Sequence, residues 1–83
     1  MQEFNIDYTL DASGLNCPLP LLKAKQTLHK MTEGDILKVI ATDAGSVRDV
    51  TTFVEHSDHV LLDTFIGKSE YIYIIRCGRG AHK

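Results

Sequence analysis

The stretch that decides the fold is residues 4–31, FNIDYTLDASGLNCPLPLLKAKQTLHKM. Apolar and polar residues alternate from Phe4 to Ala12, which predicts a strand with one buried face, suited to the edge of a sheet. A loop follows, in which Gly14 can adopt a positive φ. Apolar residues then recur at helical spacing, at Leu21, Ala24, Leu28 and Met31. The stretch therefore predicts a strand, a tight loop and a helix.

Two prolines mark the start of this helix. Proline fits the first helical turn because its missing N–H would have no partner there. Pro20 disfavours helical geometry at Leu19, so we expect the helix to begin at Pro18 or at Pro20. Cys17 then lies at or just before the helix N-terminus.

The rest of the chain predicts one more helix and three more strands. The second helix is expected after the turn at residues 43–45, with Ser46 as its N-cap and Asp49 three residues later, close to a capping box. The strands are expected at residues 36–42, 60–66 and 71–77, with a hairpin turn at 67–69 and a flexible tail at 78–83.

The predicted element order is βαβαββ. Right-handed crossovers would make the first three strands parallel and place both helices on one face. The hairpin makes the fourth strand antiparallel to the third, and its apolar run at residues 71–75 favours an interior position. The expected fold class is an α+β two-layer sandwich with a mixed four-stranded sheet.

Length and composition limit the function. Residues 1–83 are expected to form one domain, with an ordinary apolar content of 43%. The net charge of −2 argues against a nucleic-acid binder. Neither a signal peptide nor an apolar run of about 20 residues is found, so we expect a cytoplasmic protein with reduced thiols and no membrane contact. We expect no cofactor.

Cys17 is the most informative residue. A helix N-terminus favours negative charge, which predicts a lowered thiol pKa and a site that tolerates an anionic persulfide. Pro18 and Pro20 would stiffen the turn around the sulfur. The alternative is that Cys17 is a small buried apolar residue at the corner between strand and helix.

Residues 10–20, LDASGLNCPLP, resemble the signature of the TusA/SirA-like sulfur-carrier family, which carries a Cys-Pro-x-Pro motif at the start of its first helix. The likeness extends from about Asp7 to Arg76. It implies a fold similar to the C-terminal domain of translation initiation factor three, with sheet order 1-2-4-3. It also implies that Cys17 accepts sulfane sulfur as a persulfide, supported by Pro18, Pro20 and Gly14.

The same resemblance implies a sulfurtransferase-type carrier that acts stoichiometrically with partner enzymes. The implied sulfur donor is a cysteine desulfurase or a rhodanese-type protein, and the implied acceptor is a DsrE-like protein. Such relays serve tRNA thiolation, molybdenum-cofactor assembly or sulfur oxidation, and the sequence does not distinguish among them. We expect a monomer.

Other polar residues invite weaker hypotheses. Lys23, Arg48 and Lys68 are expected at the Cys17 end, as an ordinary solvated surface or as a docking patch for partners. His56 and His59 are expected in a solvated connection rather than a metal site, because no familiar zinc spacing accompanies them. No metal is therefore expected.

Cys77 is predicted to be structural or incidental rather than a resolving thiol for Cys17. An antiparallel fourth strand would carry Cys77 to the sheet edge opposite Cys17, beyond the reach of a disulfide.

Two other functions compete with the carrier. One is an RNA- or protein-binding regulatory module without sulfur chemistry, and the other is a redox switch that uses Cys17 alone. The acidic balance and the lack of clustered basic and aromatic residues count against direct binding of nucleic acid.

Overall fold

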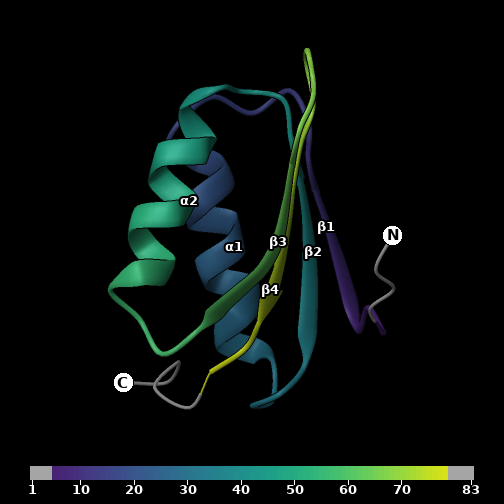
Figure 1. Ribbon diagram of the computed structural model, residues 1–83, viewed down its shortest axis with the longest axis vertical. Helices are drawn as coiled ribbons and strands as arrows, with labels where there is room; N and C mark the ends of the chain where they lie inside the picture. Colours follow the sequence, from purple (N-terminus) through teal and green to yellow (C-terminus); the bar gives the residue numbers. More distant parts are fainter. Residues whose placement is uncertain (1–4, 79–83) are drawn as a thin grey trace.

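A computed structural model describes residues 5–78 and shows two layers, a four-stranded sheet with both helices packed on one face (Figure 1). This confirms the predicted fold class, and the sheet order is β1-β2-β4-β3, as the family resemblance implied. Most of the predicted tail lies outside the described residues. The elements in chain order are β1 (Tyr8–Ala12), α1 (Leu19–Lys30), β2 (Ile36–Ala41), α2 (Gly45–Glu55), β3 (Val60–Ile66) and β4 (Tyr71–Arg76).

Strand β4 lies inside the sheet, as its apolar run predicted. It pairs antiparallel with both β2 and β3, while β1 pairs parallel with β2. The first three strands therefore share one direction, and the chain segments that follow them leave the sheet at the same edge. Figure 1 shows the start of α1, the start of α2 and the β3–β4 hairpin at this one end of the molecule.

The core lies between the sheet and the two helices. Val39 and Tyr73, paired across β2 and β4, are fully buried at its centre. Helix α1 contributes Ala24 and Leu28, and α2 contributes Val50 and Val54, in agreement with the helical spacing of the sequence. Burial of each large apolar side chain stabilises the fold by about 1.5–3 kcal/mol. The packing fixes how the two helices face each other near the sheet edge.

Element boundaries differ slightly from the predictions. Strand β1 begins at Tyr8, which pairs with Leu37, and before it the Asp7 N–H still donates to the Ile36 carbonyl at 2.8 Å. Phe4 lies outside the described residues. Strands β2 and β4 each end one residue earlier than expected. Helix α1 begins at Leu19, between the two prolines considered for its start.

The prediction that Ser46 caps α2 is wrong. The helix begins at Gly45, its N-cap is Ala44, and Ser46 is buried in the first turn. The Ser46 hydroxyl instead shares a 2.7 Å hydrogen bond with the Tyr73 hydroxyl, which satisfies two polar groups inside the core. Asp43 takes over at the turn: its carboxylate accepts the Gly45 N–H at 3.1 Å and its carbonyl accepts the Ser46 N–H at 3.0 Å.

The histidine connection is also less solvated than predicted. His56 is exposed as expected, but His59 is only 7% exposed. The His59 Nδ1 accepts the Gly78 N–H at 2.8 Å, and its ring lies 5.5 Å from that of Phe53. His59 therefore ties the end of β4 to the segment before β3. Within residues 5–78, no group of three or more histidine, cysteine or acidic residues could hold a metal ion.

No helix within the described part of the chain has the length and apolar character needed to cross a membrane.

Candidate functional site

The loops that follow β1 and β2 meet at the sheet edge. Parallel neighbouring strands bring their carboxyl ends to one edge, where α/β sheets usually place their functional groups. The Gly14 N–H donates to the Thr42 hydroxyl at 2.8 Å and so joins the two loops. Gly14 has a φ of 81°, which confirms the expected positive φ and explains why glycine suits this position.

Cys17 occupies the rim of this edge. Its side chain is exposed and its thiol is free. The Cys17–Pro18 peptide bond is cis, Pro18 is the N-cap of α1, and Pro20 is buried in the first turn of the helix. The Cys-Pro-x-Pro segment therefore presents the sulfur at the surface on a well-anchored turn, and the alternative of a buried corner cysteine is wrong.

Two carboxylates hold Cys17. Its backbone N–H donates to Asp43 Oδ2, while the other oxygen of the same carboxylate accepts the Gly45 N–H. Its thiol donates to Asp49 Oδ2, from the second turn of α2. The sulfur therefore faces an acidic side chain of α2.

This arrangement raises the pKa of the Cys17 thiol above its ordinary value. The hydrogen bond to Asp49 is the largest cause, followed by partial loss of hydration and the negative charges of Asp49 and Asp43. The prediction that the helix N-terminus lowers this pKa is wrong, because a carboxylate that accepts the S–H hydrogen bond stabilises the protonated thiol. The pKa of Asp43 is lowered by the N–H groups of Cys17 and Gly45.

Helix α2 approaches Cys17 closely at Gly45. A β-carbon on Gly45 would lie 3.2 Å from Cys17 Cβ and 3.4 Å from Cys17 Sγ. The 3.2 Å approach is tighter than most contacts of a real β-carbon, so the absence of a side chain at Gly45 lets the helix start pack against the cysteine.

The three predicted docking residues are exposed at this end of the molecule. Lys23 lies on the second turn of α1, Arg48 in the first turn of α2, and Lys68 in the β3–β4 hairpin. The charged groups that act on the thiol are carboxylates, not these cations. The docking role of the three residues stays a prediction.

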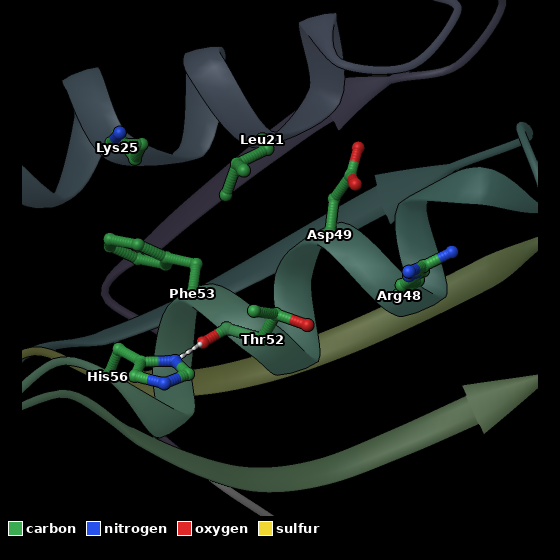
Figure 2. Close-up of a pocket in the computed structure, with 7 residues that line it drawn as sticks. All are labelled: Leu21, Lys25, Arg48, Asp49, Thr52, Phe53 and His56. Carbon is green, nitrogen blue, oxygen red and sulfur yellow. Dashed lines mark hydrogen bonds between the residues drawn. The ribbon is translucent and has the colours of Figure 1, made fainter.

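A shallow groove runs between α1 and α2 beside the site (Figure 2). It encloses about 410 Å³, and Asp49 and Arg48 line it together with Phe53. Lys25 lies with its Nζ 5.6 Å from the centre of the Phe53 ring. Figure 2 shows Asp49 extending from α2 toward α1, whereas Arg48 points away from it. The groove therefore leads toward the carboxylate that contacts the sulfur.

Cys77 lies at the other end of the fold. Its side chain is 1% exposed, and its Sγ lies 3.5 Å from the carbonyl oxygen of Leu28, near the end of α1. Its backbone N–H donates to the Asp35 carbonyl, just before β2 begins. These contacts place Cys77 at the edge opposite Cys17, as predicted, and both cysteines are free.

Asp43 and Asp49 are the site residues that sequence reasoning missed. The sequence predicts only a turn at Asp43 and a capping-box partner at Asp49. The available signal was topological: acidic residues that follow β2 must lie beside the loop that follows β1, because the two strands are parallel neighbours.

The fold and site define a class: a small α+β protein that presents one exposed cysteine on a Cys-Pro-x-Pro turn at a sheet edge. Residues 8–77 match the family model described as sulfurtransferase TusA. The chain belongs to this family, and the predicted family is confirmed.

Relatives with assigned names cover most of the chain. The chain is 44% identical over 72 residues to a sulfur carrier protein TusA of Allochromatium vinosum, covering 87% of this chain and 95% of the relative. It is 43% identical over 75 residues to a sulfur carrier protein TusA of Pseudomonas fluorescens, covering 90% of each. A crystal structure of a SirA-like protein from Desulfitobacterium hafniense has the same fold, with a TM-score of 0.74, 22% identity, and coverage of 87% of this chain and 99% of that one.

Proposed function

We propose that this chain is a sulfur carrier and that Cys17 bears the transferred sulfur as a persulfide. The observation that carries the proposal is the exposed, free thiol on the Cys-Pro-x-Pro turn. Exposure matters because a carrier must offer the same sulfur atom to a donor and then to an acceptor. The family membership and the names of the relatives support this role.

The transfer needs no external oxidant or reductant. Cys17 Sγ attacks the outer sulfur of a persulfide on the donor, and a new bond forms between the two sulfur atoms. The sulfur–sulfur bond of the donor breaks, and its electron pair leaves with the donor's own thiolate. The proton lost by Cys17 passes to that leaving group, so a thiol and a persulfide give a persulfide and a thiol.

The partners follow from this chemistry. We propose a cysteine desulfurase or a rhodanese-type protein as donor and a DsrE-like protein as acceptor. Both must reach the same rim, so Lys23, Arg48 and Lys68 are proposed to steer their docking. We further propose that the carrier acts as a monomer in the cytoplasm, where thiols stay reduced.

Neither competing function is favoured. The net charge of −2 argues against an RNA-binding module, because such modules usually carry an excess of basic residues. A redox switch has no counterpart among the named relatives, which are sulfur carriers.

The proposal is tested by following sulfur from radiolabelled cysteine through a purified cysteine desulfurase to this protein. We expect label on the native protein that a reductant removes, and none on the Cys17→Ser variant. The matched control is Cys77→Ser, which should accept label like the native protein. Label that persists on Cys17→Ser would contradict the assignment.

A further inference from the structure

A carrier needs only an exposed sulfur, and exposure alone does not require the contact between Cys17 and Asp49. The Asp49 carboxylate extends from α2, an element separate from the loop that carries the cysteine, and accepts the hydrogen bond of the thiol. Asp49 is half-buried rather than fully solvated, so its charge is only partly screened by water. A thiolate in this position would face that charge directly.

The charges that act directly on the thiol have one sign. Asp49 faces it from α2, and Asp43 faces it from the β2–α2 loop, where its carboxylate is held by the N–H groups of Cys17 and Gly45. Arg48, the cation next to Asp49 in the chain, points away from it in Figure 2. The resting site therefore opposes formation of the nucleophile that sulfur transfer requires.

We propose that Asp49 is a positioning residue that restrains Cys17 as the protonated thiol, and that a cationic side chain beside the sulfur of the partner releases it by pairing with the Asp49 carboxylate. This inference rests on the proposed sulfur-carrier role of Cys17.

The restraint acts through charge and hydrogen bonding. When a lysine or arginine of the partner pairs with Asp49, the carboxylate no longer favours the S–H form, and the thiolate becomes accessible only inside the complex. The thiol of the free carrier therefore reacts more slowly with small electrophiles that are not its partners. Asp49 thus also selects partners, because its carboxylate repels a partner that carries a negative charge beside its own reactive sulfur.

Charged thiol reagents test this selection directly. Methanethiosulfonate reagents react with a thiolate, forming a disulfide and releasing methanesulfinate, and exist with an attached trimethylammonium or sulfonate group. Rates at neutral pH are measured on the native protein and corrected by those of a small neutral thiol. We expect the cationic reagent to modify Cys17 about threefold or more faster than the anionic one, with the preference weakening as salt rises.

The matched variants identify the residue responsible. Asp49→Asn should lose most of this preference, and an uncharged reagent should react with it about threefold or more faster than with the native protein. A thiolate titration by ultraviolet absorbance should show a midpoint at lower pH in this variant. Asp49→Glu should keep the preference, and Glu55→Gln, which removes one charge from the exposed far end of α2, should leave it unchanged.

Equal preferences in the native protein and Asp49→Asn, or an unshifted titration, would overturn the inference. Should Asp49→Asn fail to fold, the native protein still decides, because the absence of any salt-dependent preference for the cationic reagent contradicts the restraint. Either result leaves the carrier role intact, since sulfur loading of Cys17 is measured separately.

Discussion

Cys17 is held by two carboxylates with different tasks. Asp43 binds its backbone and that of Gly45, whereas Asp49 binds the thiol itself. The first contact positions the turn, and the second raises the pKa of the thiol. Separating them by mutation distinguishes the stability of the site from its reactivity.

Replacement of Asp43 tests the positional contact. Asp43→Asn keeps one acceptor oxygen, so it can satisfy the N–H of Cys17 or of Gly45 but not both. We expect a thermal unfolding midpoint a few degrees below that of the native protein at neutral pH. Thermal unfolding followed by circular dichroism measures this.

The same variant has a predicted pH dependence. The folded-state pKa of Asp43 lies below the ordinary value of 3.8, so its ionised form stabilises the fold above that pH. This contribution is lost as pH falls through the folded-state pKa, and the gap between Asp43→Asn and the native protein should shrink there. Glu70→Gln, at an exposed hairpin position, serves as control. A gap that is constant from neutral to strongly acidic pH would contradict the assignment.

At the scale of the elements, α2 is anchored to β4 by the buried pair of Ser46 and Tyr73. Ser46→Ala leaves the Tyr73 hydroxyl without this partner and should cost about 1–3 kcal/mol in the free energy of unfolding. Tyr73→Phe should cost less, because a serine hydroxyl in a helix can turn to a backbone carbonyl. Denaturant unfolding of both single variants and the double variant measures the coupling. The reverse ranking would show that the hydroxyl of Tyr73 does not depend on Ser46.

This pair also shows what the sequence could and could not predict. The β3–β4 hairpin and the interior place of β4 followed from apolar patterning, which reports burial along one strand. The role of Ser46 could not be predicted in this way. Serine at 46 and aspartate at 49 fit a capping box as well as they fit a buried position, and only the packing of α2 on β4 decides that Ser46 faces Tyr73.

In the functional site too, one feature could be predicted from a local sequence pattern and another could not. The Cys-Pro-x-Pro motif identifies Cys17 because a local pattern places the cysteine at a helix start. The raised pKa depends on a contact between residues that are 32 positions apart, and a local pattern carries no information on how α2 is turned toward the loop. The position of Cys17 at a helix terminus thus predicted correctly where the sulfur lies, but it predicted a lowered thiol pKa where the contact with Asp49 raises it.

On the scale of the whole molecule, the proposed docking residues lie at one end of the sheet, beside Cys17. Replacing Lys23, Arg48 and Lys68 together with Glu should slow sulfur loading from a donor about tenfold or more at low ionic strength, because charge steering acts mainly on the association rate. The difference should diminish as salt screens the charges. Stopped-flow loading rates across a salt series measure the effect. A control with Glu at Lys30 and Lys38, away from the Cys17 end, should load at nearly the native rate, and an equal slowing of both would remove the docking role.

The central claim is that Cys17 carries a transferable sulfur, and mass spectrometry after incubation with a cysteine desulfurase and cysteine tests it most directly. The account predicts a gain of one sulfur atom, mapped to the peptide that contains Cys17 and reversed by a reductant. A gain on Cys77, an oxygen adduct in place of sulfur, or no change in mass under conditions in which the desulfurase loads another carrier would contradict it.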